Sequence, residues 1–252
     1  MERLIAQAED MAEQGVKELI LVAQETTVYG KDLYGKKSLH ILLKKLCEIR
    51  GIRWIRILYC YPEEIYDELI ETIRDEKKIC HYLDIPIQHA SDHILKRMGR
   101  RTSKQELIDI VGKLRKEIPD IVLRTTLITG FPGETEEDHE ELKEFVDEME
   151  FDRLGVFTYS PEENTPAAEM ADQVPEEVKE ERRDELMELQ QEISYDRGQD
   201  RIGQELLVMI EGKVADESAY IGRTYGDAPK VDGYIFVQTG ELLMTGDLQR
   251  YV

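Results

Sequence analysis

Short apolar runs alternate with stretches of helical spacing over the first 160 positions of the chain. Apolar residues that recur about every 3.6 positions predict helices over 2–14, 38–49, 63–75, 104–117 and 134–149. The runs between them predict strands over 17–24, 54–62, 82–90, 121–131 and 153–161. This alternation predicts an α/β fold with a parallel sheet, either open or curled into a partial TIM-like βα barrel. The chain starts on a helix, so the strand that would open such a barrel is missing.

The pattern changes in the last third of the chain. A highly charged stretch over 176–197 predicts a long helix. After Gly203, short alternating runs separated by Gly, Asp and Pro predict a small all-β unit, with strands near 205–214, 218–225, 233–238 and 247–252. The expected division is therefore a partial barrel over 1–175, a linking helix over 176–203 and a β domain over 204–252 that lacks its last strand.

Helix starts carry their own signals. Ser38 stands at the N-cap position of one predicted helix, and Thr102 and Ser103 precede another. Hydroxyl side chains at these positions are expected to accept hydrogen bonds from the first free amides of each helix.

Composition and charge narrow the function classes. The chain has 252 residues, of which 41% are hydrophobic, and it has no apolar run near the ~20 residues of a membrane helix. Its first residues do not form a signal peptide, so we expect a soluble, cytoplasmic protein. The net charge of −21 disfavours binding to nucleic acid, because an acidic surface repels phosphates. The best basic patch, 96–101, is short. A basic protein partner fits this charge better, although solubility alone also explains it.

A glycine on each side of Phe-Pro marks the end of the strand over 121–131. Gly130 and Gly133 let the backbone come close to a ligand, and Pro132 stiffens the turn. A strand, a glycine-rich turn and a helix also predict free backbone N–H groups at a positive helix end. A simple strand-to-helix connection is the alternative. No Gly-Lys-Ser/Thr follows, so the turn is not a P-loop.

Five motifs, each at the end of a predicted strand, occur in order along the chain. They are AQETTVYG at 23–30, YCYPEEI at 59–65, LDIPIQHASDHILKRMGR at 83–100, LRTTLITGFPGETEED at 123–138 and GVFTYSPEENTPAAEM at 155–170. Together they resemble the methylthiotransferase family of radical S-adenosylmethionine (SAM) enzymes. The β unit, with YIGRTYGDAPKVDGYIFV at 220–237, resembles that family's TRAM domain.

The resemblance is strongest to the branch that methylthiolates the β-carbon of an aspartate in a small-subunit ribosomal protein. It implies SAM and [4Fe–4S] clusters as cofactors of the complete enzyme. The tRNA-modifying branch usually has a Pro-Val-Gln-Ser-Gly form where this chain has IPIQHASD at 85–92, and its TRAM domain tends to be basic. Here 204–252 holds more Asp and Glu than Lys and Arg, which suits a basic ribosomal protein and makes tRNA an unexpected partner.

The resemblance also implies roles for individual residues. The turn over 128–134 corresponds to the element on the adenine side of SAM, and the loop after the first predicted strand to the element near its methionine amino group. Arg124 would pair with the SAM carboxylate, and a salt bridge to a neighbouring strand is the equal alternative. His89 is expected to be a structural histidine rather than a proton carrier. The implied SAM-binding residues are Gln24, Glu25, Thr26, Gln88, Ser91, Arg124, Thr129, Gly130, Pro132 and Gly133.

The cysteines do not follow the family's pattern. Radical SAM enzymes hold their cluster with three thiolates in CxxxCxxC. Cys47 falls within a predicted helix, Cys60 near a strand end and Cys80 before the next strand, so no metal ligand is predicted. We expect an internal part of a longer enzyme, which alone assembles no radical SAM cluster and is inactive. The sequence leaves its residual affinity for SAM open.

Three alternatives remain open at the level of sequence. In the first, the chain is part of a tRNA adenosine methylthiotransferase. In the second, it is a non-catalytic module that binds a ribosomal protein. Otherwise it is a metal-independent βα enzyme in which Glu25, His89 and Glu134 perform acid–base chemistry. The last alternative explains the polar strand ends but not the five motifs together.

Overall fold

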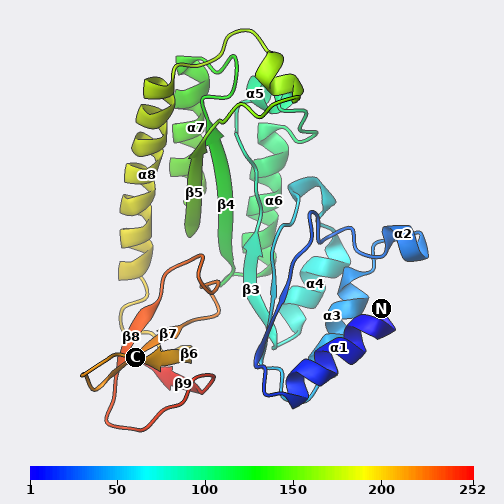
Figure 1. The fold of residues 1–252 in the computed structure, drawn as a ribbon, viewed down its shortest axis with the longest axis vertical. Coiled ribbons are helices and arrows are strands. Elements are labelled where there is room, and N and C mark those ends of the chain that lie inside the picture. Colours follow the sequence, from blue (N-terminus) through cyan, green and yellow to red (C-terminus); the bar gives the residue numbers. More distant parts are fainter. The chain divides into compact units, whose positions relative to one another are not determined.

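The computed structural model describes all residues from 1 to 252 (Figure 1). It divides into two compact units. The first unit consists of Met1–Leu58, Tyr66–Leu83 and Arg201–Val252. The second consists of Tyr59–Ile65 and Asp84–Asp200. Each unit therefore combines segments that are distant in sequence.

The first unit contains a three-stranded parallel layer. Its strands are β1 (Glu18–Leu21), β2 (Trp54–Ile57) and β3 (Ile79–Asp84), in that order, with Glu18 opposite Trp54 and Ile57 opposite Leu83. The helices are α1 (Glu2–Glu13), α2 (Lys31–Tyr34), α3 (Leu39–Glu48) and α4 (Asp67–Asp75). Leucines on α3 and isoleucines on α4 and β2 are almost completely buried, which makes this apolar layer the core: Leu42, Leu43, Leu46, Ile55, Ile57, Ile70 and Ile73.

The same unit holds a small antiparallel sheet. Strands β6 (Leu206–Lys213), β7 (Ala219–Arg223), β8 (Ile235–Gln238) and β9 (Leu248–Tyr251) lie in the order β8-β7-β6-β9. A separate cluster of Val208, Ile210, Tyr220, Val237 and Leu243 forms its core.

One buried carboxylate joins this small sheet to the parallel layer. Glu18 accepts hydrogen bonds from Arg56 Nε at 2.9 Å and from Arg223 Nη2 at 2.5 Å. Arg56 Nη1 donates to the Tyr225 carbonyl at 2.6 Å, and its guanidinium lies 4.6 Å from the centre of the Tyr82 ring. The pairing balances the charge of two guanidinium groups that are 94% or more buried, although Arg56 Nη2 has no hydrogen-bond partner. A buried guanidinium without a counter-charge would be strongly destabilising.

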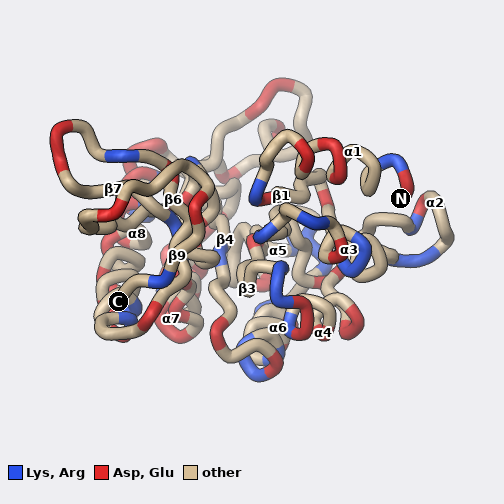
Figure 2. The backbone as a smooth tube through the Cα atoms, turned by 90° about the horizontal axis from the view of Figure 1, so that it is seen from below, with Lys and Arg blue, Asp and Glu red and all other residues tan.

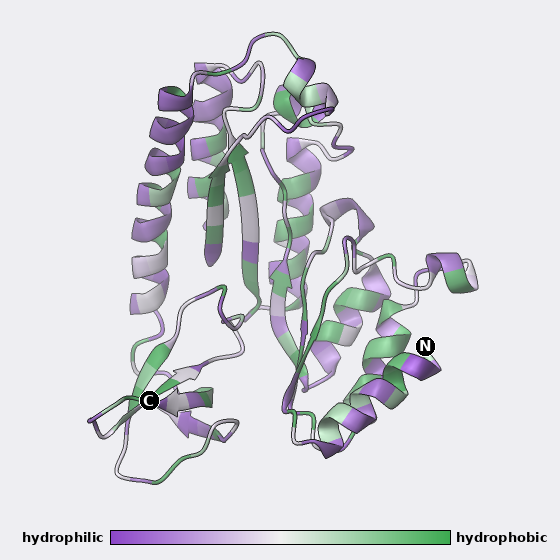
Figure 3. Cartoon of the chain, viewed as in Figure 1, coloured by the Kyte–Doolittle hydropathy of each residue, from purple (hydrophilic) through white to green (hydrophobic).

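The second unit packs helices around a parallel pair of strands. Strands β4 (Val122–Thr129) and β5 (Arg153–Thr158) pair with Arg124 opposite Arg153 and Thr129 opposite Thr158. The helices are η1 (Pro62–Glu64), α5 (Asp92–Arg97), α6 (Lys104–Glu117), α7 (Glu136–Met149), η2 (Pro166–Glu169) and α8 (Glu176–Gln199). Hydrophilic residues cover most of α8, whereas β4 and β5 carry hydrophobic positions (Figure 3).

Most predicted elements are present, and the α/β fold with parallel strands followed by a small all-β sheet is confirmed. The helix over 104–117 has the predicted bounds, because Ser103 forms a reciprocal capping box with Glu106. Ser38 is the N-cap residue of α3 as predicted, but its hydroxyl donates to the Lys36 carbonyl and makes no capping hydrogen bond. Helix α2, helix α5 and the η2 turn were not predicted.

Several predicted strands are shorter than expected, among them the run over 17–24, which is a strand only from Glu18 to Leu21. The run over 54–62 ends as a strand at Ile57, and Tyr59 adopts a left-handed conformation with φ of 59°. The run over 82–90 is a strand only to Asp84, because β3 begins earlier, at Ile79. The predicted helix over 63–75 is split into η1 and α4.

No helix of the structure combines the length and the apolar character that a membrane crossing requires.

Candidate functional site

The turn after β4 owes both of its glycines to neighbouring side chains. Gly130 and Gly133 have φ of +70° and +85°, where a side chain is strained. A Cβ atom at Gly130 would stand 2.1 Å from Lys179 Cγ on α8, and one at Gly133 would stand 2.7 Å from Arg97 Cζ on α5. The close approach that the sequence predicted is therefore made by Lys179 and Arg97 of the chain itself.

The amides of this turn are already hydrogen-bonded. The N–H groups of Gly130 and Phe131 donate to Glu134 Oε2 at 2.7 and 3.2 Å, and the Gly133 N–H donates to the Asp172 carbonyl at 2.8 Å. The prediction of free amides waiting for an anionic ligand is wrong for this turn. Its backbone is instead organised by the carboxylate of Glu134.

Glu134 sits at the centre of a fully buried polar cluster. Arg182 Nη1 donates to Glu134 Oε1 at 2.9 Å. His89 Nε2 lies 3.6 Å from Oε2, the oxygen that accepts the turn amides. The side chains of His89 and Glu134 are both 0% exposed. Because Ser91 N–H donates to His89 Nδ1 at 3.0 Å, a neutral imidazole carries its proton on Nε2, toward the carboxylate. His89 Nε2 makes no hydrogen bond, so its one side-chain hydrogen bond is the one that Nδ1 accepts from Ser91.

A second carboxylate holds the start of α7 against the loop that contains Ser91. Asp138 accepts hydrogen bonds from Ser91 Oγ at 2.5 Å and from Thr135 N–H and Oγ1 at 3.0 Å, and His93 Nδ1 lies 3.1 Å away. Burial alone would raise the pKa of Asp138, but the hydrogen bonds from Ser91, Thr135 and His93 outweigh it and lower the pKa to about 2. Ser91 is consequently engaged in structure.

Arg124 and Gln88, two further predicted site residues, differ in their side-chain contacts. Arg124 Nη1 pairs with Asp84 Oδ1 at 2.7 Å, so the salt bridge to a neighbouring strand is present. Asp84 also accepts from the Tyr59 N–H at 3.1 Å. Gln88 has φ of 72°, and its backbone bridges Thr126 and Ile128 while its side-chain amide makes no hydrogen bond within the chain. Its amide is therefore available to a ligand.

Thr129 and Pro132 connect the turn after β4 to neighbouring helices. Its side chain is buried, and its hydroxyl donates to the Lys179 carbonyl at 3.2 Å. Pro132 offers its carbonyl to Arg97 Nε at 2.8 Å. Both residues fasten the turn to α8 and α5.

The remaining predicted residues lie in the first unit, in the loop after β1. Thr26 Oγ1 donates to the Leu58 carbonyl at 2.6 Å and accepts from the Ala23 N–H at 3.2 Å. Glu25 accepts from both the backbone and the hydroxyl of Thr27. Gln24 is exposed and makes no hydrogen bond within the chain. This loop therefore presents one polar side chain, Gln24, beside two that fix its shape.

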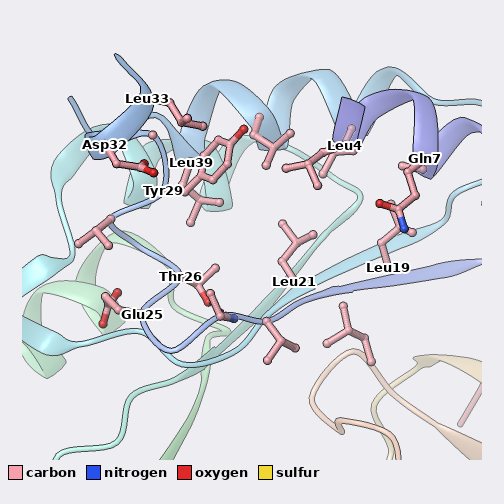
Figure 4. A pocket seen from close by; sticks show the side chains of 18 of the residues that line it. Leu4, Gln7, Leu19, Leu21, Glu25, Thr26, Tyr29, Asp32, Leu33 and Leu39 are labelled. Carbon is pink, nitrogen blue, oxygen red and sulfur yellow. Dashed lines mark hydrogen bonds between the residues drawn. The ribbon is translucent and has the colours of Figure 1, made fainter. Parts of the chain in front are cut away.

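The same loop closes one end of a largely apolar hollow of about 630 Å³ (Figure 4). Glu25, Thr26, Tyr29 and Asp32 lie at its polar end, while residues of α1, β1 and α3 line the rest: Leu4, Gln7, Leu19, Leu21, Leu39 and Leu46 are among them. The sequence motif at 23–30 marked the loop, but it gave no sign of Asp32 or of α1 as walls of a cavity.

The thiols of the chain do not fit an iron–sulfur cluster. Burial raises the pKa of Cys47 and of Cys80 to about 12, so both keep their protons and are poor ligands. Cys60 is completely buried, and neither unit gathers three His, Cys, Asp or Glu side chains in a metal-binding arrangement.

Sequence reasoning missed the residues that organise the turn from α8. Lys179 and Arg182 are 4% and 6% exposed, and Lys179 Nζ donates to the Tyr159 carbonyl at 2.9 Å. Together with Leu186, Gln190 and Ile193 they form the buried stripe of α8. Their spacing of three and four residues was the available signal, and it was hidden because three of the five residues in the stripe are polar.

Comparison with known proteins matches both parts of the chain. Residues 1–146 match the profile described as Radical SAM superfamily, and residues 202–251 match that of the TRAM domain. Among curated proteins, the ribosomal protein uS12 methylthiotransferase RimO of Lachnoclostridium phytofermentans is 67% identical over 98% of this chain, which spans 56% of that relative. RimO of Clostridium botulinum is 53% identical over 98% of the chain and 55% of the relative.

A solved structure shares the fold at low sequence identity. Coproporphyrinogen III oxidase HemN of Escherichia coli, described as a radical SAM enzyme, superimposes with a TM-score of 0.58 at 17% identity and covers 94% of this chain and 61% of its own. The chain spans about half the length of its curated relatives, and more than half of it matches one family profile. The protein belongs to the radical SAM superfamily and carries a TRAM domain after its α/β region.

Proposed function

We propose that this chain is part of a ribosomal protein uS12 methylthiotransferase, which adds a methylthio group to the β-carbon of an aspartate. The observation that carries the proposal is 67% identity to a protein of that name over 98% of the chain. The match to both family profiles in the expected order supports it. The activity belongs to the whole enzyme, because these residues span 56% of that relative.

SAM is the proposed ligand of the predicted site residues. Gln24 and Gln88 are proposed to contact it directly, because their side-chain amides make no hydrogen bond within the chain. Arg124, whose side chain is 18% exposed beside Asp84, is proposed to face the SAM carboxylate. Glu25 and Thr26 shape the loop around Gln24, and Ser91, Thr129, Gly130, Pro132 and Gly133 shape the turn after β4.

The cluster of the complete enzyme is proposed to be held by residues outside these 252. When a reduced cluster and SAM are bound, they supply the radical that activates a C–H bond. The residues of this chain contribute by binding and orienting SAM. The three thiols present here are unsuitable ligands, since burial keeps two of them protonated and the third inaccessible.

The substrate is proposed to be a basic ribosomal protein that the TRAM domain attracts. Residues 204–252 contain eight Asp and Glu against four Lys and Arg, a balance of −4. A surface of this sign favours a cationic protein and repels the phosphates of tRNA.

The decisive experiment is mass spectrometry of uS12 and of tRNA from a strain that lacks the gene. Loss of the methylthio group from the uS12 aspartate, restored by the full-length gene, is the expected result. A uS12 aspartate that keeps its methylthio group, together with loss of methylthio-adenosine from tRNA, would overturn the assignment. Unchanged uS12 and unchanged tRNA would favour a non-catalytic binding module.

Anaerobic reconstitution with iron and sulfide tests the proposed division of labour. We expect the 252-residue chain to retain no stoichiometric iron and to form no 5′-deoxyadenosine from SAM under reductant. Calorimetry with SAM then tests the site, because Gln88→Ala is expected to weaken binding whereas Gln191→Ala, on the exposed face of α8, is not. Stoichiometric iron with SAM cleavage would place the cluster on this chain and contradict the proposal.

A further inference from the structure

Two aromatic rings stand exposed on the TRAM sheet. Tyr234 and Phe236 are 60% and 63% exposed, although large aromatic side chains usually bury most of their surface. Their ring centres are 5.6 Å apart at an angle of 87°, so the two rings form one edge-to-face pair. Phe236 lies on β8 and Tyr234 directly precedes it.

The strand geometry explains why these rings do not contribute to the core. Val237 belongs to the core cluster, and Ile235 packs against it. Because side chains alternate along a strand, Tyr234 and Phe236 face the opposite side of the sheet. Phe236 lies across from Ile221 of β7, which is half-buried. The pair therefore forms an apolar, aromatic surface that folding of the sheet leaves uncovered.

The charges of the TRAM sheet restrict what this surface attracts. Of its four basic residues, Arg223 is buried against Glu18, and Arg250 pairs with Glu205 at 2.8 Å. Only Lys213 and Lys230 remain as surface cations outside such ion pairs, and two of the eight acidic residues over 204–252, Glu205 and Glu211, are the partners in those pairs. Figure 2 shows how Lys and Arg (blue) and Asp and Glu (red) are distributed along the backbone. One of the acidic residues, Glu217, lines a hollow at the Gln238 end of β8.

We propose that the Tyr234–Phe236 surface is a docking site for an extended protein segment rich in Lys and Arg. The faces of the rings attract ammonium and guanidinium groups through cation–π contacts, and the net charge of −4 over 204–252 adds long-range attraction. Single-stranded RNA also stacks on exposed rings, but this net negative charge repels its phosphates. The inference rests on the proposed function, and it specifies which part of the TRAM domain holds the basic protein substrate.

Fluorescence anisotropy with the 252-residue chain tests this site. Three labelled probes are compared: a short peptide with several Arg and Lys residues, the same peptide with Gln at those positions, and a single-stranded oligouridylate. We expect only the cationic peptide to bind, with an affinity that falls as salt rises. Phe236→Ala and Tyr234→Ala are each expected to weaken binding by about 2- to 5-fold.

Two further variants separate a cation–π site from a merely apolar one. Phe236→Leu keeps much of the apolar area but removes the aromatic face, and it should weaken binding about as much as Phe236→Ala. Tyr195→Ala, which removes a 67% exposed aromatic ring from α8, should leave binding unchanged. Equal binding of the Gln peptide, stronger binding of RNA, or a Phe236→Leu variant with full affinity would each overturn the proposal.

The mass spectrometry described above distinguishes the two proposals. Ring-dependent binding of the cationic peptide in a protein whose deletion leaves uS12 unchanged would support the docking site and reject the proposed enzyme. Loss of the uS12 modification in the deletion strain, with peptide binding that ignores both rings, would support the enzyme and reject this docking site.

Discussion

Two buried glutamates in this protein use the same chemistry for different purposes. Glu18 holds two guanidinium groups, on residues 38 and 205 positions further along the chain. Glu134 also binds an arginine, Arg182, but its other oxygen accepts the amides of Gly130 and Phe131, only four and three positions away. The first is a tertiary link between a parallel strand and the TRAM sheet, whereas the second organises a local turn.

The difference shows what a buried carboxylate can stabilise. Glu18 is matched by cations, so its removal leaves two buried positive charges with too few partners. Glu134 is matched mainly by dipoles and by one cation, so its removal frees a turn rather than separating two sheets. The predictions below test this contrast, from the largest expected effect to the smallest.

Glu18→Gln is expected to destabilise the first unit most. Arg56 and Arg223 stay buried without a full negative charge between them, which typically costs ~3–5 kcal/mol. Urea unfolding followed by circular dichroism measures the loss. Glu211→Gln is the matched control, because Glu211 also contacts Arg223 but is 38% exposed, and it should cost less than ~1 kcal/mol. Equal losses in the two variants would mean that burial does not set the strength of the link.

Gly130→Ala is expected to cost ~2–4 kcal/mol in the second unit, because a left-handed φ and overpacking act together. The new methyl group would stand 2.1 Å from Lys179 Cγ, so α8 has to move away from the turn. Gly112→Ala is the opposite case, since this glycine lies exposed within α6 with no heavy atom near its missing Cβ. It should stabilise the chain by ~0.5–1 kcal/mol. Thermal unfolding of both variants checks the opposite signs.

The sequence predicted the elements that depend on local pattern. The bounds of the helix over 104–117 were predicted correctly because its apolar stripe and its end lie within the segment and its cap, Ser103, directly precedes it. Strand existence was predicted just as well, because buried runs in an α/β protein are short and apolar. The order of the TRAM strands is not a local property, and it became visible only in the structure.

Strand ends and long-range contacts could not be predicted from the sequence, because they depend on residues that are distant along the chain. The run over 54–62 stays apolar, but the left-handed Tyr59 and its hydrogen bond to Asp84 end the strand early. The Glu18–Arg223 link joins positions 205 residues apart, and no local pattern reports it. The turn after β4 was located correctly, yet the side-chain conformation of Glu134, which closes its amides to a ligand, had no sequence signal.

Glu134→Gln is expected to cost ~1.5–3 kcal/mol, the range for hydrogen bonds to a charged group. Its single remaining acceptor oxygen serves either the turn amides or Arg182, but not both. Hydrogen exchange at Gly130 and Phe131 should accelerate, while exchange in the core of α6 should change far less. Glu136→Gln removes the other, 70% exposed partner of Arg182 and serves as the control. Uniform acceleration across the second unit would contradict a local role for Glu134.

Asp138 gives the smallest and most specific effect, a loss of stability in acid. Its pKa in the folded chain is about 2, below its ordinary value of 3.8, so its contribution is present above pH 4 and is lost as the pH falls through 2. We expect Asp138→Asn to lower the free energy of unfolding by ~1–2 kcal/mol near neutral pH and to match the parent chain in strong acid.

Ser91→Ala should raise the pKa of Asp138, because the strongest hydrogen bond to the carboxylate disappears, and should move the acid transition upward. Asp75→Asn is the control, since Arg74 also lowers the pKa of Asp75, but on the solvent-exposed surface of α4. A parent chain and an Asp138→Asn variant that differ equally at all pH values would show that the charge of this carboxylate is not what holds α7 to its loop.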